Sequence, residues 1–295
     1  MTAFSAIDLS KLPAPDLIET VDFETVLQAC RDYLAEVAPD LADSLLESDP
    51  ASKVLEVLAY RELLLRQRIN EAARGVLLAA AGGADLDQLG AWWGVSRLLL
   101  DAGDPEAVPP VAPTYESDDA FRSRIQLALE GYTSAGPIGA YTFHALSAHG
   151  QVKSVSVTSP VAGDVLVTVL GTEDDGTPSA EVLTAVEAAL NDQDVRPLCD
   201  TVTVQAATIV NYTVTAVLTI GSGPDAATVL AAAQAAVETY VAAQHKVGAR
   251  VALSGLYQAL HQPGVEFVTL TLPAADITPT ATEAAYCTAI TITQA

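Results

Sequence analysis

Apolar residues between positions 50 and 81 recur at alternating intervals of three and four residues, which is typical of one face of an α-helix. Asp49 can cap this helix, Pro50 suits its first turn, and Gly82 and Gly83 can end it. We therefore predict a helix over residues 50–81 that is roughly 45 to 50 Å long. The positions of this heptad-like series, in which Glu62 is the one polar member, are Leu55, Leu58, Glu62, Leu65, Ile69, Ala72, Val76 and Ala79.

A second apolar set widens the face of this long helix. A helix with so broad an apolar face packs on more than one neighbour, so we expect both sets to be buried. The members of the second set are Val54, Val57, Leu64 and Leu77.

Shorter elements precede and follow the long helix. Residues 1–20 are predicted to form an extended arm, and helical patterns cover about 22–37 and 85–93. The stretch DAGDPEAVPPVAPT at residues 101–114 contains four prolines and predicts a linker. Further helices are predicted from residue 117 to about 132 and, after the break GYTSAGPIGAY, through 143–148.

From residue 152 onward the apolar period changes to two, which indicates half-buried strands. Two strand–loop–helix–strand units are predicted at 164–204 and 212–253, and the strand at 210–220 is long enough to contain a bulge. Further strands are expected at 265–272 and 286–293. The pattern predicts an α+β fold with a mainly antiparallel sheet and its helices on one face. The predicted domains are 1–100 (arm and helical region), 101–116 (proline-rich linker), 117–204 (middle α+β domain) and 205–295 (C-terminal α+β domain).

The composition of the chain bears on which kinds of molecule it can bind and on where it is made. The net charge of −23 and the pI near 4.2 argue against binding to nucleic acid. No apolar run has the length of a membrane span, and the first twenty residues are acidic, unlike a secretion signal. We expect a soluble protein made in the cytosol, without membrane insertion. Cys30, Cys199 and Cys287 are far apart in sequence, which predicts reduced thiols and neither disulfides nor a zinc site.

Residues that could carry catalysis show no recognisable arrangement. The four histidines lack paired metal-ligand spacing, and the chain has no GxSxG sequence for a serine nucleophile. We therefore expect no enzymatic activity, no metal ion and no cofactor. The alternative is a small-molecule-binding enzyme that uses the glycine-rich turn between Gly131 and Gly139, with His144 and His149 nearby.

Four arginines stand out in the stretch AYRELLLRQRINEAARG, residues 59–75 of this acidic chain. One interpretation is that they pair with Glu62 and Glu71 along the helix and keep its surface soluble. The other is that Arg61, Arg68 and Arg74 meet acidic surface on another subunit, because the guanidinium fork binds carboxylates with two hydrogen bonds.

Trp92 and Trp93 are adjacent, so only one of them can readily face a helix core. The other is expected at the surface or at a subunit contact, where tryptophan is a frequent anchor. The full set of candidate interface residues is Leu55, Leu58, Leu65, Ile69, Val76, Arg61, Arg68, Arg74, Trp92 and Trp93.

Several long segments, in the same order along nearly the whole chain, resemble the baseplate assembly protein J family of contractile-tailed bacteriophages. They are IDLSKLPAPDLIETVDFETVL, ESDPASKVLEVLAYRELLLRQRINEAARGVLLAAAGGADLDQLGAWWGVSR, DDAFRSRIQLALEGYTSAGPIGAYTFHALSAHG, DVRPLCDTVTVQAATIVNY and VGARVALSGLYQALHQPGVEF. The family also occurs in R-type bacteriocins.

The resemblance implies a structural role with no catalytic or cofactor residues. Two J-like chains would associate with one copy of a second, I-like wedge protein, and six such wedges would form a ring around the central hub. The ring would also contact a sheath-attachment wedge protein, and its opening would trigger sheath contraction. Assembly would take place in the cytoplasm of the bacterial host, and the final location would be the tail baseplate.

The resemblance also implies that different parts of the chain make different contacts in the assembly. The helix at 50–81 would join the core bundle of the wedge, the β-rich C-terminal part would join neighbouring wedges, and a hinge would lie at 101–114. A generic oligomeric scaffold outside phage tails is the other structural alternative.

Overall fold

The computed structural model describes residues 9, 12, 13, 15, 22–42, 46–133, 136–221, 223 and 225–295. The predicted arm at 1–20 therefore lies almost wholly outside the described residues. Contacts divide the chain into an N-terminal unit, which ends at Ser96, and a main unit, which begins at Arg97. Each unit is described by itself.

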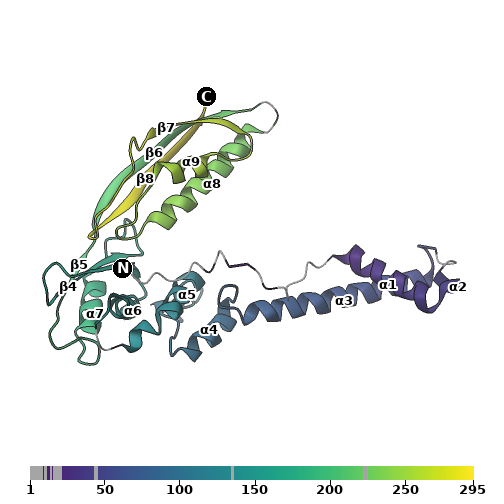
Figure 1. The fold of residues 1–295 in the computed structure, drawn as a ribbon, viewed down its shortest axis with the longest axis horizontal. Coiled ribbons are helices and arrows are strands. Elements are labelled where there is room, and N and C mark those ends of the chain that lie inside the picture. The colour runs from purple at the N-terminus through teal and green to yellow at the C-terminus, as the bar shows by residue number, and fades with distance from the viewer. Residues whose placement is uncertain are drawn as a thin grey trace. The chain divides into compact units, whose positions relative to one another are not determined.

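The N-terminal unit is helical, as predicted (Figure 1). It contains α1 (Phe23–Val37), α2 (Pro39–Ala42), α3 (Pro50–Gly75) and α4 (Gly83–Trp92). Asp22 caps α1 by accepting a hydrogen bond from the backbone N–H of Thr25 at 2.9 Å. Helices α1 and α3 pack side by side through a small core of Val26, Leu27 and Ala59, with Phe23, Cys30 and Leu55 around it.

Helix α3 begins at Pro50 as predicted but ends at Gly75, so the prediction of helix as far as residue 81 is wrong. Its 26 residues give a length of about 39 Å. Beyond Gly75 the chain makes tight turns, in which Leu77 N–H donates to the Arg74 carbonyl and Ala80 N–H to that of Leu77. The apolar residues after Gly75 keep the helical spacing, which is why the sequence pattern alone overran the helix end.

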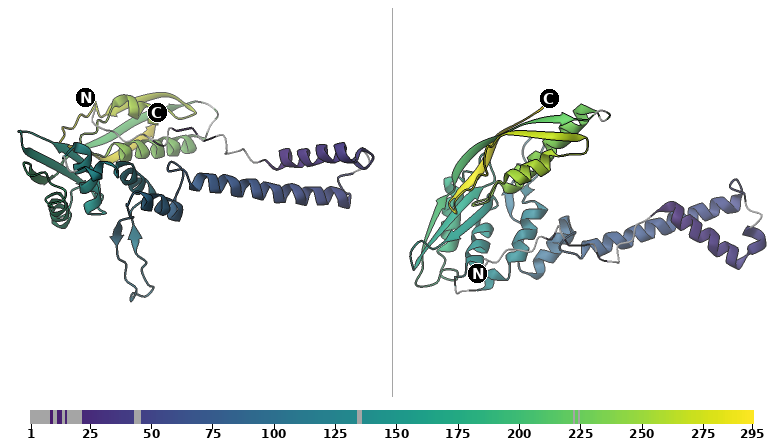
Figure 2. Two further views of the ribbon diagram at one scale, coloured as in Figure 1. Left: turned by 60° about the horizontal axis from the view of Figure 1, so that its bottom comes forward. Right: turned by 45° about the horizontal axis from the view of Figure 1, so that its top comes forward.

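The main unit opens with a β-ribbon where a proline-rich linker was predicted. Strands β1 (Leu99–Asp101) and β2 (Thr114–Tyr115) pair antiparallel, and Asp104 bridges Val111 further out (Figure 2). The N–H of Glu116 donates to the carbonyl of Leu98 at 3.0 Å. The two ends of this stretch are therefore hydrogen-bonded to each other, and the residues between them form a hairpin-like loop. A loop of this kind does not act as a spacer between the regions before and after it. A hinge at 101–114 is therefore not supported.

A three-stranded sheet of order β3–β4–β5 follows. It comprises β3 (Val152–Thr158), β4 (Asp164–Gly171) and β5 (Thr201–Ala206), and it is preceded by α5 (Asp118–Leu127), the 3₁₀ turn η2 (Glu130–Tyr132) and α6 (Ile138–Ala148). Helix α7 (Ala180–Leu190) connects β4 to β5, which pair in parallel. Val182, Val186 and Leu190 of α7 are fully buried against Val167 and Val169 of β4.

The C-terminal sheet has the order β7–β6–β8. Its elements are β6 (Thr208–Ile220), α8 (Ala226–Gln244), α9 (Leu253–Leu260), β7 (Val265–Leu272) and β8 (Glu283–Gln294). The strand expected to end near residue 253 is wrong: Val251 forms only a single bridge to Ile277, and α9 begins two residues later. The bulge predicted within the strand at 210–220 is wrong: consecutive residues Tyr212 and Thr213 of β6 face Cys287 and Ala289, so the extra residue, Thr288, lies in the partner strand β8.

The α+β class is confirmed, and the sheets are mixed. β3–β4 and β6–β7 are antiparallel, whereas β4–β5 and β6–β8 are parallel. A parallel pair requires a long connection, which α7 supplies in the first sheet. In the second sheet the connection from β6 to β8 includes α8, α9 and β7.

Among the described residues one helix, α8, is long and apolar enough to cross a membrane by length and composition alone. A core helix of a globular domain meets the same two criteria. Val229, Ala233 and Val237 of α8 are buried in the core of the C-terminal sheet.

His245, at the end of α8, connects this part of the chain to β3. Lys153 Nζ donates to His245 Nδ1 at 2.9 Å, so Nε2 carries the ring proton and donates to the Asp175 carbonyl at 3.1 Å. Burial, and then the positive charge of Lys153, lower the pKa of His245 below its usual value. Burial and the neighbouring Lys246 likewise lower the pKa of Lys153. This contact therefore depends on a neutral imidazole.

Candidate subunit interface

Most of the predicted interface positions on α3 are exposed. Leu58, Leu65 and Ile69 are 54%, 60% and 59% exposed, and Val76 just after the helix is exposed as well. Leu55 differs because it is half-buried against α1. Val54, Val57 and Leu64 of the second apolar set are also exposed in the single chain, so α1 does not cover them and their predicted burial requires another neighbour.

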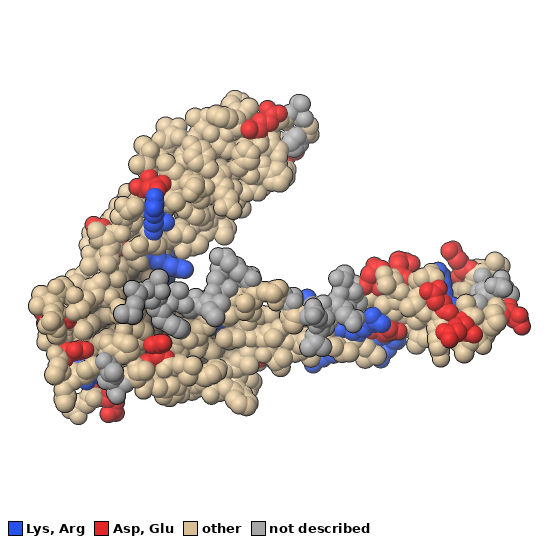
Figure 3. All heavy atoms as spheres, viewed as in Figure 1, with Lys and Arg blue, Asp and Glu red and all other residues tan. Residues whose placement is uncertain are grey.

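The apolar face of α3 contains two of the three candidate arginines. Arg61 and Arg68 are two helical turns apart, and the 3.6-residue period places both between the exposed apolar side chains of Val54 and Val57. Arg74 lies on a different side of the helix, in register with Gln67. Figure 3 shows lysine and arginine side chains gathered over α3, while acidic side chains dominate the region of α1 and α2.

Intrahelical ion pairs account for only part of this basic cluster. Arg66 binds Glu62 with an Nη2–Oε1 distance of 2.7 Å, and Arg68 approaches Glu71 at 3.7 Å. The Arg68 side chain remains 80% exposed, so its ion pair is screened by water and contributes little to stability. The guanidinium groups of Arg61 and Arg68 are therefore accessible to another molecule.

A groove of about 340 Å³ between α1 and α3 borders the exposed face. The sequence analysis missed the contribution of α1, although the four-residue spacing of Tyr33 and Val37 is a signal for it. Both side chains are exposed, and together with Leu58 they give the groove a mostly apolar wall. The lining residues are Ala29, Cys30, Tyr33, Leu34, Val37, Leu55, Leu58 and Glu62.

Both tryptophans at the end of α4 reach the surface. Trp92 is 88% exposed and Trp93 is 42% exposed. Leu86 and Gly90 form the buried side of this helix instead. An indole left this open to water in one chain is a typical feature of a contact with another.

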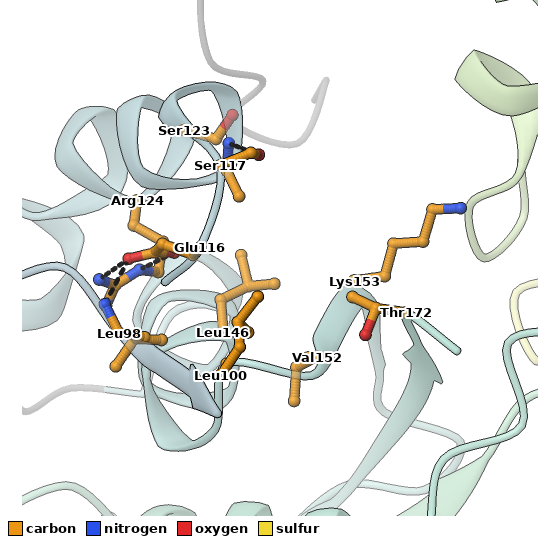
Figure 4. Close-up of a pocket in the computed structure, with 12 residues that line it drawn as sticks. Leu98, Leu100, Glu116, Ser117, Ser123, Arg124, Leu146, Val152, Lys153 and Thr172 are labelled. Carbon is orange, nitrogen blue, oxygen red and sulfur yellow. Dashed lines mark hydrogen bonds and ion pairs between the residues drawn. The ribbon is translucent and has the colours of Figure 1, made fainter. Parts of the chain in front are cut away.

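A pocket of about 420 Å³ lies in the main unit, between β1, α5, α6 and β3 (Figure 4). Its polar wall is a buried ion pair, in which Arg124 Nη2 and Nε bind the two carboxylate oxygens of Glu116 at 2.6 and 3.2 Å. Glu116 also accepts a hydrogen bond from the N–H of Leu98, and Arg124 donates to the hydroxyl of Ser147. The pair thus joins the base of the β-ribbon to α5 and α6, and these groups are engaged with each other.

Comparison with known proteins identifies the family. Models of the Baseplate J-like N-terminal, central and C-terminal domains match residues 47–104, 133–206 and 212–293. Baseplate protein J of Escherichia phage P2 is 46% identical over 288 residues, which cover 96% of this chain and 95% of the relative. The chain belongs to the baseplate J-like family. The resemblance noted in the sequence is confirmed.

The alternative site of this J-like chain, the glycine-rich turn, has a packing role in the described residues. Gly131 leaves room for the ring of Phe143, and Gly139 leaves room for Glu130. His144 Nε2 lies 3.2 Å from the Gly131 carbonyl, and His149 Nδ1 accepts from the Gln151 N–H. Burial lowers the pKa of His144. No group of three potential metal ligands occurs in the part of the chain that the structure describes.

Proposed function

We propose that this chain is a structural protein of a contractile-tail baseplate, in which two copies join a second, I-like wedge protein. Six such wedges form a ring around the central hub, the ring also contacts the sheath-attachment wedge protein, and its opening triggers sheath contraction. Membership of the baseplate J-like family supports the general role. The exposed apolar face of α3 is the observation that supports assembly through this helix.

The physical argument rests on uncovered apolar surface. α1 packs on one side of α3, around Ala59, and leaves Leu58, Leu65 and Ile69 in water. A contiguous apolar surface of this kind marks a protein contact in a soluble chain. The seven-residue spacing of Leu58 and Leu65 suits knobs-into-holes packing against further helices. The adjoining groove between α1 and α3 can receive side chains from such a helix.

Arg61 and Arg68 give this surface a preference for acidic partners. They lie within the apolar face, where a neighbouring helix would shield them from water and strengthen their attraction to carboxylates. A second copy of this chain, whose net charge is −23, offers such carboxylates. Trp92 is proposed as an additional anchor at a subunit contact.

The test replaces Leu58, Leu65 and Ile69 together with aspartate in the chain co-expressed with the other wedge proteins. Because all three side chains are more than half exposed, circular dichroism should show a folded monomer. Native mass spectrometry should show the loss of wedge complexes, because the substitutions place three charges in the contact. Complexes at normal yield would refute assembly through this face.

A matched control is available on the same helix. Gln67→Asp combined with Arg74→Asp also changes the charge by three units, one from the glutamine and two from the arginine, but on a side of α3 that faces away from Leu58, Leu65 and Ile69. This variant should assemble normally. Arg61→Glu with Arg68→Glu should weaken assembly more than Arg74→Glu does, and an equal effect would show that the arginines only keep the surface soluble.

The role in the particle is tested by deleting the gene in the producing host. Electron microscopy should show tubes and sheaths without baseplates, and the unmodified chain should restore them. Normal baseplates in the deletion strain would refute the proposed function. Restoration by the control variant, but not by the α3 aspartate variant, would assign the defect to this helix.

A further inference from the structure

The outer edge of β8 is an unpaired strand edge in the C-terminal sheet. β8 pairs with β6, and the described residues place no strand on its other side beyond the single bridge between Ala284 and Val247. That bridge covers only the beginning of β8, before the bulge that follows Cys287. The regular part of the strand, residues 289–294, therefore presents its outer backbone groups to solvent.

The hydrogen-bond pattern identifies those groups. Ala295 N–H donates to the Leu218 carbonyl at 2.9 Å, so the backbone at position 295 faces β6. Alternate residues of a strand face the same neighbour, so Thr291 and Thr293 also face β6. Ile290, Ile292 and Gln294 then direct their N–H and C=O groups away from the sheet.

This edge lacks the usual protection against pairing. Exposed edges normally carry charged residues or proline, because an open edge pairs with other strands. Residues 284–295, AAYCTAITITQA, contain neither, and the end of the stretch is rich in β-branched residues. The opposite edge strand, β7, is shorter, carries Glu266 and ends just before Pro273.

We propose that the outer edge of β8 pairs antiparallel with the same edge of a second copy of this chain. A two-fold axis at Ile292 places Ile292 opposite its own copy and Ile290 opposite Gln294 of the other copy. This register pairs all three outward-facing residues with one another and closes six backbone hydrogen bonds, two for each facing residue pair. The two three-stranded sheets become one continuous sheet.

The side chains match in this register. Ile290 and Ile292 point to the face packed against the core, so the paired strands bring isoleucine against isoleucine at the centre. Thr291 and Thr293 are exposed on the other face, where each lies opposite the other residue of the second copy. The stretch is uncharged although the chain carries −23, so the contact itself adds no like-charge repulsion.

This contact goes beyond the helical bundle proposed above, because it uses neither α3 nor a second protein. It gives each copy one contact at its helical unit and a separate one at its C-terminal sheet. The α3 aspartate variant should therefore keep the β8 contact, so the two proposals can fail independently.

The test uses sedimentation equilibrium of the purified full chain, with hydrogen exchange at the amides of Ile290, Ile292 and Gln294. The unmodified chain should dimerise, and dilution should remove the protection of these three amides. Thr291→Lys with Thr293→Lys should raise the dissociation constant about tenfold, because lysines then face each other twice across the two-fold axis. The same pair of changes at the exposed Thr269 and Thr271 of β7 is the matched control and should have no effect.

A charge swap tests the register. Thr291→Lys with Thr293→Glu places opposite charges across the interface only if position 291 faces position 293 of the other copy, so this variant should dimerise at least as well as the unmodified chain. A monomeric full chain would overturn the proposal. So would a dimer that resists the double lysine variant, or a charge swap as damaging as that variant.

Discussion

Glu116→Gln should destabilise the region around α5 more than its small change in shape suggests. The side chains of Glu116 and Arg124 are each only 5% exposed, and their closest atoms are 2.6 Å apart. Glutamine can still accept the hydrogen bond from the Leu98 N–H, so the change removes chiefly the negative charge. A buried arginine without its counter-charge costs about 3 to 5 kcal/mol, which we expect as the loss of local stability.

A double-mutant cycle isolates the ion pair. Arg124→Met alone leaves Glu116 charged and buried, whereas the double variant with Glu116→Gln contains neither charge. The double variant should therefore lose much less stability than the sum of the two single losses. Hydrogen exchange of α5 amides in the full chain measures this locally, because a multidomain chain does not unfold in two states. Additive losses, or a loss below about 1 kcal/mol for Glu116→Gln, would refute the reasoning.

Three further outcomes are expected. Because the pKa of His245 is lowered in the folded chain, the unfolded chain binds the proton more readily, and the stability of the fold should fall as the pH drops below about 6.5. The measurement is the hydrogen-exchange rate of the Val247 amide as a function of pH, and His245→Gln should abolish this loss of stability. Leu256→Ala, at a fully buried position, should cost the C-terminal sheet about 2 to 5 kcal/mol in the same type of measurement. Trp92→Ala should change the local stability of α4, measured by hydrogen exchange, by no more than about 0.5 kcal/mol and yet reduce the yield of wedge complexes; unchanged assembly would exclude its anchor role.

Local signals in the sequence predicted where helices and strands occur, but not which residues pack against them. Proline after a capping aspartate located the beginning of α3, and alternation located β4 and β6. The same periodicity predicts burial for Val54 and Val57, which are exposed in the single chain, because an apolar pattern indicates that a face is covered but not which chain covers it. The interface residues proposed on α3 remain predictions for this reason.

The sequence also did not predict which strands pair when they lie far apart along the chain. The prolines of residues 101–114 predict a linker. In the structure β1 and β2 pair with each other, and a hydrogen bond between Glu116 and Leu98, which lie outside this stretch, helps to hold them together. Similarly, nothing local distinguishes a strand that will pair in parallel, as β8 does, from one that will pair antiparallel. Tyr33 and Val37 belonged to a recognisable helical pattern, but their place in a groove depends on the packing of α1 against α3.

The parallel pairing of β6 and β8 has a mechanical consequence. The first strand of this domain, β6, begins at Thr208 and the last strand, β8, ends at Gln294, and the ladder runs from Thr208 opposite Glu283 to Leu218 opposite Gln294. Tension between those two ends acts along the strands, so it loads the hydrogen bonds of the ladder together in shear. A sheet pulled open from one end would lose its bonds one after another. This topology therefore lets the domain transmit a pulling force without unravelling from its ends.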